Sequence, residues 1–261
     1  MKSRPWPAFL LFLSMLATGP ATRAESRIVC LTVDEPNNYD AVNTCRGFAD
    51  GEWKAPGHRV TVIQGNQERP THFEGFLEAM KSADLLVVFV RRATPPQDQL
   101  DAIRAHLAAG KPLLGIRTAN HAFSPLPGQA PTDPALASWP EFVPEVLGCQ
   151  NTGYETKGLP YKVGRHPLAP GDSPLLRGVD VSRILGHVSL YRVLPLAADV
   201  SPLLLGQAEG IEPAQPIAWT RLHGPRKARV FYTSLGAPAD IVQPSVRRLI
   251  GNAVNWTLGA D

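Results

Sequence analysis

Cysteine is scarce in this chain, and its scarcity excludes several classes of protein. Only three of the 261 residues are cysteines, Cys30, Cys45 and Cys149, too few for a disulfide-rich scaffold and not spaced like the ligands of a zinc site. Cys30 lies in an apolar run, which favours a buried, inert thiol. A disulfide between Cys45 and Cys149 is an alternative that the sequence leaves open. No cysteine stands at a predicted strand-to-helix turn, so a Cys/His nucleophilic pair is not expected.

Long apolar runs are also missing, with one exception at the start of the chain. Residues 1–24 begin with Lys2 and Arg4, continue with an apolar run over residues 8–17 and end in small residues, which is the layout of a secretory signal peptide. An uncleaved membrane anchor is the alternative, but the run is short for a membrane span and breaks at Gly19-Pro20. We therefore expect an exported protein, periplasmic or secreted, with no membrane contact after signal cleavage.

An excess of charge of one sign is absent from the rest of the chain. The formal net charge of +3 equals the three basic residues of residues 1–24, so 23 basic and 23 acidic residues balance over residues 25–261. A neutral domain gives no electrostatic reason to expect a nucleic-acid partner. The length suits one domain, and no linker or internal repeat divides it.

Four apolar runs in the first half predict β-strands, at residues 27–33, 58–65, 84–90 and 112–116. They are apolar on both faces, which is typical of strands inside a parallel sheet that helices cover. Helical patterns over residues 73–83 and 95–110 fill two of the gaps, and an amphipathic stretch ends the chain at residues 244–259. This alternation predicts an α/β fold: a flavodoxin-like, doubly wound, mostly parallel sheet with helices on both faces.

The second half of the chain departs from this alternation. Residues 124–170 are rich in proline and glycine, and so long a segment without regular periodicity is usually functional, or a lid, in a compact domain. Short β-rich runs follow at residues 183–196, 201–207, 216–223 and 229–236. They predict a more antiparallel C-terminal extension at the edge of the sheet.

Polar residues follow the predicted strands directly. Because the carboxyl ends of parallel strands meet along one edge of a sheet, these residues are expected to share a crevice there. Carboxylates, guanidiniums, amides and an imidazole in one crevice suit a polyhydroxylated or anionic small molecule. The candidates are Asp34, Glu35, Asn37, Arg91, Arg92, Arg117, Thr118, Asn120, His121, Ser234 and Asp240.

Each of these residue types also has a purely structural explanation. Asp34 and Glu35 suit the start of a helix, where acids are common. Arg91 and Arg92 could extend their stems around a strand end, and His121 could be a buried imidazole with a backbone partner. A metal site made of the two acids and His121 lacks the usual ligand spacing, so neither a metal nor another cofactor is predicted.

The stretch KPLLGIRTANHAF, residues 111–123, changes abruptly from apolar to polar at Arg117. In several α/β enzymes such a change delivers a nucleophile on a tight strand-to-helix turn. A guanidinium stays protonated and cannot be the nucleophile, but it is suited to bind a carboxylate, a phosphate or paired hydroxyls. Thr118 lies one residue past the turn and would need its own base and oxyanion hole.

Several motifs together resemble the ThuA-like family of trehalose-utilisation proteins, which shares the class I glutamine amidotransferase-like fold. Four occur in the expected order, and two further segments extend the resemblance over nearly all of residues 25–261. The four are GKPLLGIRTANHAF (110–123), IAWTR (217–221), RVFYTSLGAPAD (229–240) and NAVNWTLG (252–259), and the two segments are VDEPNNYD (33–40) and SLYRVLPLA (189–197).

The resemblance also shows where this chain departs from the amidotransferases. In those enzymes the fourth-strand turn resembles Gly-Ile-Cys, and a late strand ends in His-Pro-Glu. This chain has Arg117 at the cysteine position, Ala237 at the histidine position and Asp240 near the acid. Without the thiol and its base, no glutaminase activity is expected. ThuA-like proteins commonly have Gly-His where this chain has Gly236-Ala237, and a histidine-rich loop often seen near residues 145–155 is absent.

The resemblance implies a carbohydrate or sugar-derived small molecule as the ligand. As an enzyme, the protein would transfer protons on a sugar or oxidised sugar. Asp34, Glu35 or His121 would be the acid/base groups, Arg117 and Arg91 would stabilise oxyanion charge, and the remaining candidates would bind the substrate. The alternative is a non-catalytic sugar-binding or accessory protein on the same scaffold. A structural component of a larger assembly, docking through residues 124–170, is a third hypothesis, and the sequence does not indicate an oligomeric state.

Overall fold

A computed structural model describes residues 25–54, 57–65, 71–126, 128–131, 133–155 and 158–260. The predicted signal peptide, residues 1–24, lies outside the described residues. Within those ranges, every helix is too short or too polar to cross a membrane.

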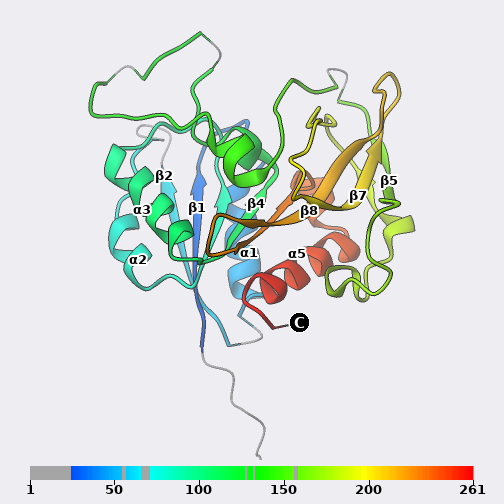
Figure 1. The fold of residues 1–261 in the computed structure, drawn as a ribbon, viewed down its shortest axis with the longest axis horizontal. Coiled ribbons are helices and arrows are strands. Elements are labelled where there is room, and N and C mark those ends of the chain that lie inside the picture. The colour runs from blue at the N-terminus through cyan, green and yellow to red at the C-terminus, as the bar shows by residue number, and fades with distance from the viewer. Residues whose placement is uncertain are drawn as a thin grey trace, which may run out of the picture.

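The first half of the chain alternates strands and helices, as its apolar periodicity predicts (Figure 1). The first four strands pair in parallel in the order β2-β1-β3-β4. All five residues of β3 are buried, as expected of a strand covered on both faces. The elements are β1 (Arg27–Val33), α1 (Ala41–Asp50), β2 (Arg59–Gly65), α2 (Phe76–Ser82), β3 (Leu85–Phe89), α3 (Gln97–Ala108) and β4 (Leu113–Ile116).

The second half of the chain adds antiparallel strands, and one of them, β9, lies in the interior of the sheet. Strand β9 pairs in parallel with β4 and antiparallel with β8, so it is an interior strand that the sequence had assigned to an edge. The described sheet runs β2-β1-β3-β4-β9-β8-β7-β5-β6, and four of its eight pairings are antiparallel. The prediction of a mostly parallel sheet was therefore wrong, whereas the α/β class is confirmed. The added strands are β5 (Tyr161–Arg165), β6 (Leu185–Gly186), β7 (Ser201–Gln207), β8 (Gln215–His223) and β9 (Ala228–Thr233).

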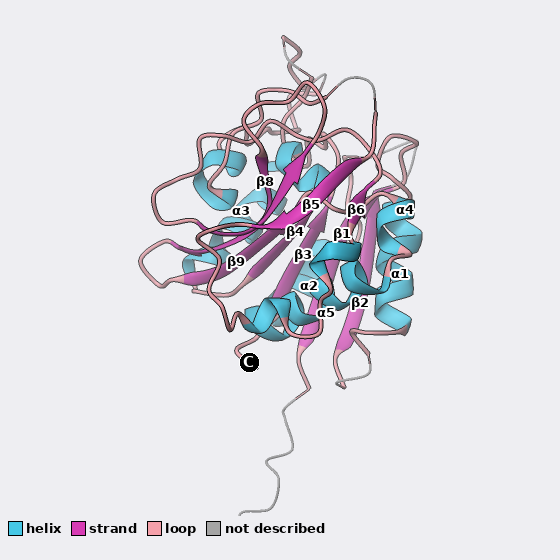
Figure 2. Ribbon diagram, turned by 90° about the vertical axis from the view of Figure 1, so that its right-hand side faces the viewer, coloured by secondary structure: helices cyan, strands magenta, loops and turns pink. Residues whose placement is uncertain are grey.

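Helices pack on both faces of the sheet (Figure 2). Alternate residues of β1 point to opposite faces, because the side-chain period of a strand is two: Val29 and Leu31 join one buried cluster, and Ile28 and Cys30 join the other. The first cluster includes residues of α2 and α3, and the second includes residues of α1 and of the C-terminal helix α5 (Pro244–Thr257).

The proline-rich segment 124–170 is ordered by aromatic packing at its described residues. A π-helical turn, η2 (Phe142–Leu147), forms in it, and the Phe142 ring packs edge-on against Phe123 and Trp139 at centroid distances of 4.9 and 5.3 Å. Strand β5 follows in the same segment. The remaining short elements are η1 (Arg117–His121), η3 (Pro174–Leu176), η4 (Val181–Arg183) and α4 (Pro238–Ile241).

The cysteines pair differently from the sequence-based expectations. Cys30 of β1 is disulfide-bonded to Cys45 of α1, with the Cα atoms 6.7 Å apart. Cys149 is free and buried, and burial raises the pKa of its thiol to about 12. The expectation of an inert Cys30 thiol was wrong, and the Cys45–Cys149 disulfide that the sequence left open does not form. The reason is that α1 packs directly over β1, which the spacing of the cysteines does not reveal.

Candidate functional site

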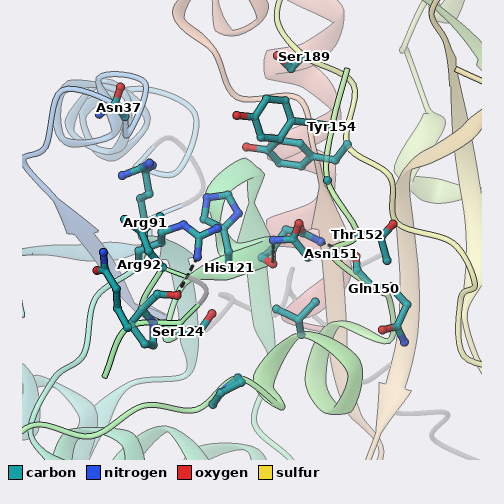
Figure 3. A pocket seen from close by; sticks show the side chains of 18 of the residues that line it. Asn37, Arg91, Arg92, His121, Ser124, Gln150, Asn151, Thr152, Tyr154 and Ser189 are labelled. Atoms are coloured by element: carbon teal, nitrogen blue, oxygen red, sulfur yellow. Dashed lines mark hydrogen bonds between the residues drawn. The ribbon is translucent and has the colours of Figure 1, made fainter. Parts of the chain in front are cut away.

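A cavity of about 1130 Å³ opens at the carboxyl ends of β1, β3 and β4 (Figure 3). The loops that follow these strands form one side, and residues 124–126, η2 and residues 150–154 form the other. The predicted residues that line it are Asn37, Arg91, Arg92, Asn120 and His121. The predicted residues that do not line it are Asp34, Glu35, Arg117, Thr118, Ser234 and Asp240.

The backbone at this edge of the sheet is unusual. Arg117, the first residue after β4, has φ of 40°, and Arg92 after β3 and Tyr39 after β1 have φ of 48° and 55°. Non-glycine residues seldom adopt this left-handed region, and they concentrate at functional sites. The sharp turn predicted at Arg117 is therefore present, and it leads directly into the short helix η1.

The Arg117 side chain is fully buried behind the cavity wall. One guanidinium nitrogen donates to the Ser234 carbonyl at 2.7 Å, and the other donates to the Ser189 carbonyl at 3.2 Å and the Tyr39 hydroxyl at 3.3 Å. The guanidinium carbon lies 4.3 Å from the ring centre of Tyr39 and 4.6 Å from that of Tyr191. Three of these four partners line the cavity, so a positive charge lies just beneath its surface.

The two acids after β1 have different surroundings. Asp34 is exposed and lies outside the cavity lining. Glu35 is partly buried, and its Oε1 accepts from Arg91 at 3.1 Å and from Asn37 at 2.9 Å. Its carboxylate is thus committed to an ion pair that orients Arg91 at the rim of the cavity.

The cavity environment is unfavourable for a positive charge on His121. Burial, together with the positive charges of Arg92, Arg91 and Arg117, lowers the pKa of its imidazole to about 3. The ring meets Tyr191 edge-on at a centroid distance of 5.8 Å. At neutral pH the imidazole is therefore uncharged and faces the cavity (Figure 3).

Thr118 and Asn120 hold the turn in place. The Thr118 hydroxyl donates to Asn38 Oδ1 at 2.7 Å, and the Asn38 amide donates to the carbonyls of Val33 and Phe89, both at 3.0 Å. This network ties the ends of β1, β3 and β4 together. Asn120 donates to the Gln150 carbonyl at 3.1 Å, which joins the turn to the opposite wall.

Asp240 stabilises the loop behind Arg117 and does not line the cavity. Its buried carboxylate accepts from the backbone N–H groups of Gly236 and Ala237 at 3.0 and 3.1 Å. It also accepts from the backbone N–H of His187 at 2.9 Å, and lies 3.2 Å from His187 Nδ1. The same loop presents the Ser234 carbonyl to Arg117. Asp240 and Ser234 therefore position Arg117, whereas a direct ligand contact was predicted for both.

Sequence reasoning missed several residues at this site. Tyr39 and Tyr191 stack on Arg117, Tyr154 lines the cavity with 55% of its surface exposed, and His187 pairs with Asp240. Tyr39 lies in the segment that carries the family resemblance, two residues after the predicted Asn37, so it could have been included. Tyr154 comes from the segment 124–170 without regular periodicity, and Tyr191 and His187 come from the β-rich run 183–196, whose position in the chain does not indicate its proximity to this site.

The arrangement fits a binding site better than a nucleophilic one. The sharp turn after β4 carries a buried guanidinium, and neither a thiol nor a hydroxyl stands at its point. Among the described residues, no group of three or more histidine, cysteine and acidic side chains gathers to hold a metal ion. The cavity does offer two guanidiniums, several side-chain amides, three tyrosines and an uncharged imidazole.

The fold and the cavity define an α/β protein with a strand-end cavity and a sharp strand-to-helix turn at Arg117. No protein-family model matches the chain, and no curated protein matches it. Similar solved structures include a protein described as ThuA-like from Bacteroides uniformis ATCC 8492, 14% identical with a TM-score of 0.63, covering 92% of this chain and 94% of its own.

Two other solved structures are similar. A protein described as ThuA-like from Parabacteroides merdae ATCC 43184 is 12% identical, with a TM-score of 0.61 and 90% of each chain covered. The mmIFT52 N-terminal domain is 10% identical, with a TM-score of 0.52, covering 90% of this chain and 98% of its own. The resemblance to ThuA-like proteins is thereby confirmed for the fold, and identities this low carry no information about function.

Proposed function

We propose that this protein is an exported, ThuA-like protein that binds a carbohydrate or sugar-derived small molecule in the strand-end cavity. The observation that carries the proposal is the lining of the cavity. Asn37, Gln150 and Asn151 line the cavity with side-chain amides, and Tyr154 presents an exposed aromatic ring. Amides pair with hydroxyl groups as donors and acceptors, and aromatic faces pack on the apolar faces of sugar rings.

Binding without catalysis is favoured over proton-transfer catalysis by the positions of the predicted catalytic residues. Of Asp34, Glu35, Arg117 and His121, only His121 lines the cavity. Its pKa of about 3 makes it a weak base at neutral pH. An acid/base enzyme that uses His121 on a sugar or keto-sugar is the second candidate, and the neutral imidazole facing the cavity is the observation that supports it.

Export and the finer fold assignment belong to the same proposal. The Cys30–Cys45 disulfide supports an oxidising compartment, periplasmic or extracellular, because disulfides persist there and are rare in the cytosol. The parallel strand order β2-β1-β3-β4-β9 supports a flavodoxin-like, doubly wound first half of the sheet.

A thermal-shift screen against neutral sugars, keto-sugars and sugar acids tests the binding proposal. A ligand at about 100 times its Kd stabilises the native state by about 2.7 kcal/mol, which raises Tm by about 5–10 °C for a domain of this size. Replacing Thr152, which lines the cavity, with tryptophan should abolish the shift. The control is Thr61→Trp at an exposed position of β2, away from the cavity. A flat response to every compound would refute the proposal.

A further inference from the structure

The charges around the cavity do not balance. Arg91 and Arg92 line it, and Arg117 lies directly behind its tyrosine wall. No aspartate or glutamate is among the described lining residues. The nearest carboxylate that pairs with any of the three is Glu35, which binds Arg91. Three guanidiniums thus face one paired carboxylate.

Of the three guanidiniums, Arg117 is the most deeply buried, and no carboxylate compensates its charge among the described residues. Its side chain has no solvent exposure, and among the described residues it forms no ion pair. Its Nε is buried without a hydrogen-bond partner. Burying a charge is unfavourable by several kcal/mol unless a counter-charge compensates it. Two carbonyls, one hydroxyl and two aromatic faces solvate the guanidinium, but none of them is an anion.

Arg92 extends the same positive region into the cavity. One of its terminal nitrogens donates to the Pro125 carbonyl at 2.9 Å, and the part of the chain that the structure describes contains no acid paired with it. Burial lowers the pKa of this guanidinium, and Arg91 lowers it further. The close approach of Arg91 and Arg92 is held by the fold, since consecutive residues leave β3 in a turn with φ of 48° at Arg92.

We infer that the ligand of this cavity carries an oxyanion, and that Arg91 and Arg92 bind it directly while Arg117 attracts it through the wall. This inference rests on the proposed function and narrows it to a hydroxylated ligand with a carboxylate or phosphate group, such as a sugar acid. Guanidiniums bind both groups through paired N–H donors. The amides on the other side of the cavity then bind the hydroxyls. The uncharged His121 keeps its ring free to accept or donate a hydrogen bond.

Calorimetric titration of the protein with four probes tests the inference: glucose, glucuronate, glucose 6-phosphate and inorganic phosphate. At least one charged sugar should bind about 10-fold or more tightly than glucose, since hydrogen bonds between two charged groups are stronger than those between a charged and a neutral group. Raising the NaCl concentration should weaken the binding of the charged sugar and leave the binding of glucose unchanged. The two charged sugars distinguish a carboxylate from a phosphate ligand.

Variants separate a specific subsite from general charge. Arg92→Gln should raise the Kd of the charged sugar about 10-fold or more and leave the Kd of glucose unchanged. Arg91→Gln should have the same effect and releases the Glu35 carboxylate, so it provides a second measurement if the first variant folds poorly. Arg46→Gln removes an exposed arginine that bonds Gln64 outside the cavity, and should change nothing.

The outcomes distinguish this inference from the proposed function. Equal binding of glucose and both charged sugars would overturn the inference and leave sugar binding intact. Inorganic phosphate binding that Arg92→Gln removes, with no sugar effect, would support the oxyanion subsite and refute the sugar proposal. Absence of binding by all four probes would overturn both.

Discussion

Asp240 is the residue whose replacement tests the architecture behind the site most directly. Its carboxylate is fully buried, accepts from three backbone N–H groups and lies 3.2 Å from His187 Nδ1. Oδ1 faces the backbone N–H and Nδ1 of His187, and Oδ2 faces the backbone N–H groups of Gly236 and Ala237. Asp240→Asn keeps the size of the side chain and replaces one acceptor oxygen with a donor NH2 group.

The expected cost follows from these contacts. Whichever way the amide is oriented, at least one backbone N–H loses its acceptor and faces another donor, and the remaining hydrogen bonds lose a charged acceptor. Each buried donor without a partner costs about 1–3 kcal/mol, and removal of the buried negative charge offsets part of the total. We expect the free energy of unfolding to fall by about 2–4 kcal/mol. The β9–α4 loop that presents the Ser234 carbonyl to Arg117 should loosen with it.

Urea unfolding followed by tryptophan fluorescence measures this change, and a thermal melt should show a Tm lower by roughly 5–15 °C. The control is Asp172→Asn, which changes an exposed acid and should stay within about 0.5 kcal/mol of the unmodified protein. If Asp240→Asn were as stable as the control, the buried carboxylate would not be holding the loop, and the role assigned to Asp240 would be wrong.

Three further predictions concern stability. Burial lowers the pKa of His106 to about 4, so below the unfolded pKa of about 6.5 the unfolded state binds more protons than the folded state, and the free energy of unfolding should fall by about 2 kcal/mol between pH 7 and 4.5. Urea titrations at several pH values should show a smaller fall for His106→Gln, and the same dependence on pH in both proteins would contradict the assignment. Gly236→Ala places a methyl group 2.8 Å from the Arg117 Cβ and should cost about 1–3 kcal/mol, whereas Gly171→Ala, with open space around it, should be neutral by the same assay. Reducing the Cys30–Cys45 disulfide, which closes a 15-residue separation, should lower stability by about 3 kcal/mol, and equal melting curves with and without reductant would refute that contribution.

Local pattern accounts for the parts of the fold that were predicted correctly. The first four strands and the helices α2, α3 and α5 lie where apolar periodicity places them, because burial on one or two faces requires apolar side chains at fixed intervals. The turn at Arg117 was predictable for the same reason: an apolar strand ends abruptly, and the backbone must reverse into η1.

Pairing between segments distant in the chain accounts for the parts of the fold that were predicted wrongly. The β-rich run that became β9 looks the same in sequence whether it pairs at the edge or inserts beside β4, since strand formation is encoded locally and the choice of partner is not. The half-antiparallel sheet and the Cys30–Cys45 disulfide both follow from packing between segments distant in the chain.

The candidate site shows the same contrast between what residue types determine and what long-range packing determines. From its residue types alone, the sequence determined that position 117, after the fourth strand, holds a guanidinium, which cannot act as a nucleophile. Only the tertiary structure decided that Arg117 is buried without a carboxylate, that Glu35 pairs with Arg91 while Asp34 stays exposed, and that two tyrosines separate Arg117 from the cavity. The physical reason is that residue type sets what a side chain can do, whereas burial and neighbouring charges set what it does.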